Sequence, residues 1–221
     1  MCRPRERAFK QFKCPRPQCV NNKLAGLPTF HKVYTFGDGR KRTAIVIKDD
    51  QLDATLITQL SNEDSVAVEV RFEAVKFYSV SMYFDTCRDI EEDIRQLEKV
   101  MDYTKGNGLI IAVDSNARSK MWHDTITNQR GKILEEFIIC NNLYVLNEAT
   151  ETPTFQSNRG SSRIDPTITN SRPVRYVSDW ICGEEESCSD HSTVNFKIAS
   201  VDNAAPSGRA VLGVGIRPLA R

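Results

Sequence analysis

Apolar residues in the middle of the chain recur in patterns that predict strands. Residues 43–48 form a short apolar run, residues 66–72 alternate between apolar and polar, and residues 75–84 follow after a tight turn. Alternation with a period of two is typical of half-buried strands, and two such runs joined by a tight turn predict an antiparallel hairpin. Residues 109–113 are apolar throughout, so we expect a central strand that is covered on both faces.

Two other segments have the period of an amphipathic helix. Asp89 stands three residues before Glu92, which is the sequence pattern of a helix cap, and the apolar residues that follow recur at helical spacing. They are Ile90, Ile94, Leu97 and Met101. Glycines at 106 and 108 end this helix, and a second helix is expected over residues 129–141.

The remaining apolar runs are short, and we expect strands near residues 143–146, 163–169, 175–182 and 193–198. Hairpins and crossovers are therefore mixed, with only a few helices between the strands. This combination predicts an α/β sandwich rather than an all-parallel doubly wound sheet.

The two ends of the chain lack sustained periodicity, so the sequence is divided into three parts. Residues 1–41 are expected to form an irregular basic leader, residues 42–200 the folded domain, and residues 201–221 a disordered tail. The first 23 residues hold seven Lys or Arg and one acid. Such a segment is either a solvated leader or an arm that contacts nucleic-acid phosphates.

Neither a membrane span nor a secretory signal is expected. No apolar run approaches the ~18 residues needed to cross a bilayer, and the charged N-terminus is not followed by an apolar segment. The seven cysteines are scattered, without the two spaced pairs of a zinc site. These features favour a nuclear or intracellular protein that is not secreted.

Carboxylates stand at three places where an apolar run meets a polar loop. Asp114 and Asn116 follow the all-apolar strand, and Asp165 lies in a later strand segment. Asp190 and His191 come directly before the last predicted strand. A lone Asp-x-Asn is most often a turn, and a lone Asp-His pair is most often a surface pair. The ordered set of three is typical of metal-assisted phosphodiester hydrolysis.

The region from residue 44 to residue 198 resembles the endonuclease/exonuclease/phosphatase superfamily. The matching segments occur in family order and comprise residues 81–84, 113–119, 121–124, 128–131, 143–147, 153–155, 162–167, 177–180 and 189–191. The chain is most similar to the apurinic-type endonuclease domain of non-LTR retrotransposons, in particular the lineage that inserts into ribosomal RNA genes. This resemblance implies a four-layer α/β sandwich, in which two mixed sheets are faced by helices.

The resemblance also implies roles for individual residues. Asp114 would orient the attacking water, and Asn116 and Tyr83 would contact the scissile phosphate. His191 would also contact the phosphate, while Asp165 fixes the orientation of its ring. Tyr83 has an alternative interpretation as a core aromatic of its strand.

The implied cofactor is Mg²⁺, and Asp190 is expected to help hold it. Contacts to DNA are expected from polar residues in the matching segments, namely Arg118, Ser119, His123, Arg163 and Thr167. The implied partners are DNA and the reverse transcriptase domain of the parent element, which this chain lacks. No membrane partner is implied.

Two departures from the family pattern bear on activity. The Glu that serves the family as main metal ligand is not found before residues 21–28, where the basic leader replaces the first strand–helix–strand. Pro166 follows Asp165 and lacks the N–H that a central strand donates. We interpret the chain as a truncated or rearranged copy of a mobile-element endonuclease, with weak or no activity. Its family reaction is Mg²⁺-dependent nicking of DNA, which leaves a 3′-hydroxyl for target-primed reverse transcription.

Two other interpretations stay open. The chain is either a non-catalytic nucleic-acid-binding remnant of a mobile element, or a product without a selected role. We also expect that the proline-rich leader does not replace the missing central strands, because each proline deletes a hydrogen-bond donor.

Overall fold

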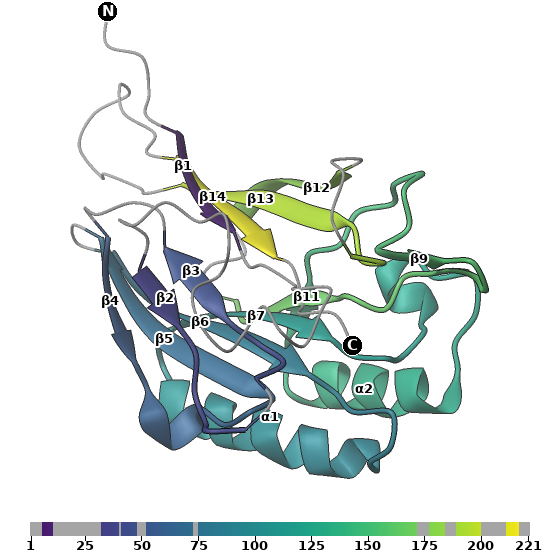
Figure 1. Ribbon diagram of the computed structural model, residues 1–221, viewed down its shortest axis with the longest axis horizontal. Coiled ribbons are helices and arrows are strands. Elements are labelled where there is room, and N and C mark those ends of the chain that lie inside the picture. The colour runs from purple at the N-terminus through teal and green to yellow at the C-terminus, as the bar shows by residue number, and fades with distance from the viewer. Residues whose placement is uncertain are drawn as a thin grey trace, which may run out of the picture.

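Two six-stranded sheets and two helices make up the computed structural model of the chain (Figure 1). It describes residues 6–10, 32–39, 41–47, 52–72, 75–171, 177–183, 189–199 and 211–216. The predicted α/β class, in which hairpins and crossovers are mixed, is confirmed by this arrangement.

The first sheet is built on the predicted hairpin. Its strand order is β4-β5-β6-β7-β11-β8, with bounds Asp53–Leu56, Ser65–Phe72, Val75–Tyr83, Gly108–Asp114, Thr167–Thr169 and Tyr144–Val145. β5 and β6 pair antiparallel along their whole length, whereas β6 and β7 pair parallel because a helix connects them. β7 lies near the middle of the sheet, as its apolar sequence predicts.

Both helices pack on the same face of this first sheet (Figure 1). α1 spans Ile90–Thr104 and α2 spans Gln129–Cys140, close to the predicted ranges. The Asp89 side chain caps α1 and the Asn128 side chain caps α2, each by accepting a backbone N–H of the first turn. Among the described residues no helix covers the second sheet, so this part of the chain contains three of the four predicted layers.

The second sheet has the strand order β12-β13-β14-β1-β3-β2. The bounds are Val177–Gly183, Thr193–Ala199, Val211–Ile216, Glu6–Lys10, Ile45–Ile47 and Lys32–Tyr34. A separate two-stranded hairpin is formed by β9 and β10, which span Phe155–Ser157 and Gly160–Ser162.

Three strands of this sheet correct the prediction for the ends of the chain. β1 and β2 lie in the segment expected to be an irregular leader, and β14 lies in the segment expected to be a disordered tail. β14 pairs with β13 on one side and with β1 on the other, and β1 pairs in turn with β3. The middle of the sheet is therefore filled by strands from both ends, contrary to the expectation from the prolines of the leader, because β1 lies between Pro4 and Pro15 and contains none. Residues 1–5, 11–31, 40, 201–210 and 217–221 of these two segments lie outside the described residues.

Side-chain alternation along β7 divides the core in two. Leu109, Ile111 and Val113 belong to the core between the first sheet and the helices, whereas Ile110 and Ala112 belong to the core between the two sheets. Because Asp114 continues the second set, its side chain faces the second sheet at the end of the strand.

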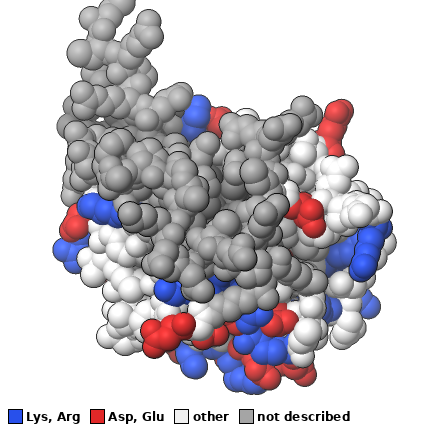
Figure 2. All heavy atoms as spheres, viewed as in Figure 1, with Lys and Arg blue, Asp and Glu red and all other residues white. Residues whose placement is uncertain are grey.

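Acidic and basic side chains are interspersed on the face drawn in Figure 2. The described atoms visible there form no extended patch of one sign. Any attraction of a polyanion by the described residues on this face therefore depends on local groups.

Candidate active site

Asp114 and Tyr83 lie side by side at the ends of two neighbouring parallel strands. Tyr83 is the last residue of β6 and pairs in register with Asp114, the last residue of β7. Tyr83 is 4% exposed and Asp114 is 1% exposed. Their shared register places both side chains on the face that looks toward the second sheet. The two predicted site residues thus lie at the same edge of the first sheet.

Asn116 is fixed by the turn that follows β7. Its backbone has a positive φ of 47°, and its side-chain N–H donates to the carbonyl oxygen of Phe84 at 2.8 Å. The hydroxyl of the preceding residue, Ser115, donates to the carbonyl oxygen of Ile164 at 2.7 Å. This turn therefore ties the end of β6 to the segment that precedes β11.

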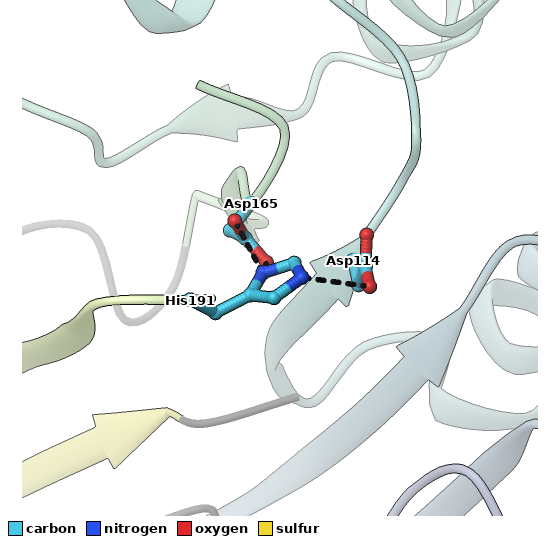
Figure 3. Close-up of side chains that lie close together, drawn as sticks. All are labelled: Asp114, Asp165 and His191. Carbon is cyan, nitrogen blue, oxygen red and sulfur yellow. Dashed lines mark hydrogen bonds and ion pairs between the residues drawn. The ribbon is translucent and has the colours of Figure 1, made fainter. Parts of the chain in front are cut away.

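Asp165 and His191 form a buried pair, although 26 residues separate them in the sequence. The Nδ1 atom of His191 lies 2.9 Å from Oδ1 of Asp165 and 3.1 Å from Oδ2. Figure 3 shows the ring held edge-on to this carboxylate. A carboxylate at Nδ1 selects the tautomer in which Nδ1 carries the proton, because that nitrogen must donate.

The same ring points its other nitrogen at Asp114. Nε2 of His191 lies 3.6 Å from Oδ2 of Asp114, so the imidazole sits between two carboxylates (Figure 3). His191 lies two residues before β13 of the second sheet, whereas Asp114 ends β7 and Asp165 lies two residues before β11 of the first. The site therefore exists only when the two sheets are packed together.

These three residues are also a possible metal-ligating group. One ligand atom of each lies within 4.8 Å of the others, and all three residues are buried. Two buried carboxylates favour a bound cation, since their negative charge is costly without one. Oxygen ligands suit Mg²⁺, and Nδ1 of His191 is already engaged by Asp165. The donor set therefore fits a divalent cation held mainly by the carboxylates of Asp114 and Asp165.

Asp190, the residue predicted to help hold the metal, lies outside this group. It is exposed, and its backbone carbonyl accepts the N–H of Gln156 at 2.7 Å. The position expected for the family's metal-binding Glu falls among residues 11–31, which lie outside the described residues.

Arg118 and Arg163 are held by one buried carboxylate, Asp124. Nε of Arg118 donates to Oδ1 of Asp124 at 2.9 Å, and the backbone N–H of Arg163 donates to Oδ2 at 2.7 Å. Burial opposes ionisation of Asp124, but these hydrogen bonds outweigh it and lower its pKa. Asp124 thus stays charged and joins the loop after β7 to the segment before β11.

Two of the predicted DNA contacts are corrected by burial. Ser119 and Thr167 have exposed fractions of 0% and 1%. The Ser119 hydroxyl donates to Glu135, and the Thr167 hydroxyl accepts the indole N–H of Trp180 at 3.1 Å. Their side chains have no surface to offer a nucleic acid, because both serve the packing of the domain. His123 is exposed, with Nε2 3.0 Å from the carbonyl oxygen of Asn147.

Arg42 was not singled out by the sequence, although it contacts a predicted site residue. Its guanidinium lies 4.7 Å from the ring centroid of Tyr83 and forms ion pairs with Asp64 and Asp85. These carboxylates raise the pKa of Arg42 against the opposing effect of burial. The Cys87 backbone N–H and Arg42 lower the pKa of Asp85 to about 2. The sequence shows Arg42 only as a cation directly before the strand predicted over residues 43–48. Its role could not be predicted, because its partners Asp64 and Asp85 are distant in sequence.

Comparison with known proteins identifies relatives among mobile elements. A sequence model described as endonuclease-reverse transcriptase matches residues 77–195. The retrovirus-related Pol polyprotein of the type-1 retrotransposable element R1 of Bradysia coprophila is 28% identical over 202 residues, which cover 85% of this chain and 20% of that protein. A putative 115 kDa protein in element R1DM of Drosophila melanogaster is 24% identical over 204 residues, with coverage of 86% and 20%. The chain spans one fifth of the length of these two relatives.

Solved structures with the same fold include two endonucleases. The endonuclease domain of TRAS1, a telomere-specific non-LTR retrotransposon, has a TM-score of 0.72 at 30% identity, covering 78% of this chain and 81% of that one. The AP endonuclease LMAP of Leishmania major has a TM-score of 0.60 at 15% identity, covering 81% and 74%. The second likeness concerns the fold alone. Within the described residues, no helix has the length and apolar character needed to span a membrane.

Proposed function

We propose that this chain, which belongs to the endonuclease-reverse transcriptase family of retrotransposon endonuclease domains, nicks DNA by hydrolysing one phosphodiester bond. The observation that carries the proposal is the buried imidazole between the carboxylates of Asp114 and Asp165. Phosphodiester hydrolysis needs a base for water and a donor for the phosphate oxygens, and this arrangement supplies both.

Asp114 is the proposed base. Its carboxylate accepts a proton from the attacking water, which it holds at the end of β7. Its burial and its fixed register with Tyr83 restrict where that water can sit. Restricting the water to one place lowers the entropy cost of reaching the transition state.

His191 is the proposed phosphate contact. With Nδ1–H donated to Asp165, a protonated ring presents Nε2–H to a phosphate oxygen beside Asp114. Asn116 and Tyr83 lie on the adjoining strand ends and are proposed to contact the same phosphate. The exposed His123 and the half-buried Arg118 and Arg163 are proposed contacts to the flanking DNA.

Mg²⁺ is the proposed cofactor, and the carboxylates of Asp114 and Asp165 would hold it, with Asp190 on the adjoining loop as a further candidate ligand. When bound, it supplies positive charge that stabilises the phosphate oxygens during hydrolysis. The family's Glu ligand is not found in this sequence, so we expect nicking to be slow. We propose further that the chain works inside the cell, in the nucleus, and that the 3′-hydroxyl it leaves serves a reverse transcriptase.

The test is nicking of supercoiled plasmid by the full chain, with Mg²⁺ and with EDTA, beside the variant Asp114→Asn. We expect slow Mg²⁺-dependent nicking that the variant lacks, because an amide cannot take the proton of water. Nicking that persists in Asp114→Asn or in EDTA would contradict the proposal.

A second candidate function, non-catalytic binding of nucleic acid, is favoured because the Glu that serves the family as main metal ligand is not found in this sequence. Salt-dependent binding to DNA without any nicking would support it, because phosphate contacts weaken steeply as salt rises.

A further inference from the structure

Thr154 is buried directly before β9 and holds the backbone beside Asp165. It is 1% exposed. Its hydroxyl oxygen accepts the backbone N–H of Ile164 at 3.0 Å and that of Asp165 at 3.3 Å. Residues 163–166 lie outside any strand. The carbonyl oxygens of Ile164 and Pro166 accept the N–H groups of Ser115 and Val113 at the end of β7. The Thr154 hydroxyl accepts the N–H groups that this contact leaves over, those of Ile164 and Asp165.

The backbone of the same residue holds the chain beside His191. The carbonyl oxygen of Thr154 accepts the N–H of Ser192 at 2.9 Å. Phe155, the next residue, forms an isolated β-bridge with His191, and their rings meet edge to face at a centroid distance of 4.8 Å. One residue therefore bonds to both segments that supply the buried pair.

The pair needs such a connection because nothing local joins its members. Asp165 lies before β11 of the first sheet and His191 before β13 of the second, and Pro166 after Asp165 has no N–H to donate. A small shift between the two segments would lengthen the contact of 2.9 Å between Nδ1 and the carboxylate. Hydrogen bonds weaken steeply with distance and misalignment.

We propose that Thr154 is a positioning residue that sets the geometry of the Asp165–His191 pair. The inference rests on the proposed function for its effect on nicking, but the geometry of the pair can be measured without it. The competing interpretation is that Thr154 contributes only to stability, as a buried hydroxyl that satisfies two N–H groups.

The decisive comparison is Thr154→Val against Thr154→Ser in the full chain. Valine has the shape of threonine and cannot accept a hydrogen bond, whereas serine keeps the oxygen. Thr169→Val is the matched control, because Thr169 is also fully buried and its hydroxyl donates to Leu109 at 2.8 Å, away from the pair. Each variant is measured by urea unfolding, by proton NMR of the His191 Nδ1–H, and by nicking.

We expect the Nδ1–H resonance, present at low field in the unchanged chain, to move or broaden in Thr154→Val and to persist in Thr154→Ser and Thr169→Val. The kcat of nicking should fall roughly 10- to 100-fold in Thr154→Val with little change in KM, since a displacement of about 1 Å can cost that much. Thr169→Val should lose stability without this effect on kcat.

Several results would overturn the proposal. One is an unchanged Nδ1–H resonance in a folded Thr154→Val, and another is an equal change in Thr169→Val. Absence of the resonance from the unchanged chain would show that the pair itself is not formed. If Thr154→Val does not fold, Thr154→Ser decides. An altered Nδ1–H resonance in a Thr154→Ser variant whose melt is unchanged also refutes the proposal. Absence of nicking by the unchanged chain would count against the proposed function, while the NMR result still decides the role of Thr154.

Discussion

Gly131→Ala should destabilise the protein, although it places the better helix former inside a helix. Gly131 lies in the first turn of α2, where its N–H donates to the Asn128 side chain at 2.8 Å. A Cβ at this position would lie 1.9 Å from the carbonyl oxygen of Arg118 and 2.9 Å from its carbonyl carbon. The atoms in the way are backbone, so no side-chain rotation can relieve the clash.

The magnitude follows from opposing effects. Alanine in place of glycine favours a helix by ~0.5–1 kcal/mol. To reach an ordinary van der Waals contact, the Arg118 carbonyl must move by roughly 1.5 Å. Overpacking of this kind costs ~1–3 kcal/mol. Arg118 also exchanges two hydrogen bonds with Asn128, at 3.0 and 3.2 Å, and each contributes ~1 kcal/mol. We expect a net loss of about 2–4.5 kcal/mol in the free energy of unfolding.

The same displacement should reach the site, because Arg118 is two residues from Asn116. Urea unfolding and plasmid nicking of Gly131→Ala are compared with Lys132→Ala, an exposed position on the same helix. We expect the glycine variant to lose both stability and nicking, and the lysine variant to lose neither. A free energy of unfolding within ~0.5 kcal/mol of the control would refute the reasoning, since surface substitutions stay within that range.

Asp165→Asn and His191→Ala should each remove most of the nicking, and the double variant should be little worse than either, because the pair acts as a unit; multiplicative losses in plasmid nicking would contradict the pairing. Burial raises the pKa of Asp93 to about 7 despite Arg88 and Arg130 nearby. The folded chain therefore binds more protons than the unfolded chain between about pH 4 and 7, and stability should fall as pH rises through that window. Urea midpoints at pH 5 and pH 8 check this, and Asp93→Asn should flatten the change between them; an unaltered difference would show that another group is responsible.

Elements with strong local signals could be predicted from the sequence. The helix after Asp89 and the one after residue 128 begin where their caps indicate, because capping side chains bond to the nearest backbone N–H groups. The hairpin of β5 and β6 likewise follows from alternation on both sides of a short turn. These features depend on residues within a few positions of one another.

Features that depend on distant partners could not be predicted. β14 contains two glycines and has no clear alternation, and it becomes a strand by pairing with β13 and β1. The types of the site residues marked Asp114, Asp165 and His191 as candidates, but the sequence carries no distance between them. The roles of Thr154 and Asp124 were missed because each depends on hydrogen bonds to segments that only the fold brings near.

The pairing of Tyr83 with Asp114 makes strand length a requirement of the site. A one-residue insertion or deletion in β7 would turn Asp114 toward the helices, because successive side chains point to opposite faces. Changes at the exposed tip of the β9–β10 hairpin leave this register untouched, whereas a single codon gained within Gly108–Asp114 removes the proposed base from the site. The number of residues in β7 is therefore a stricter condition on the site than the identity of the apolar residues that precede Asp114.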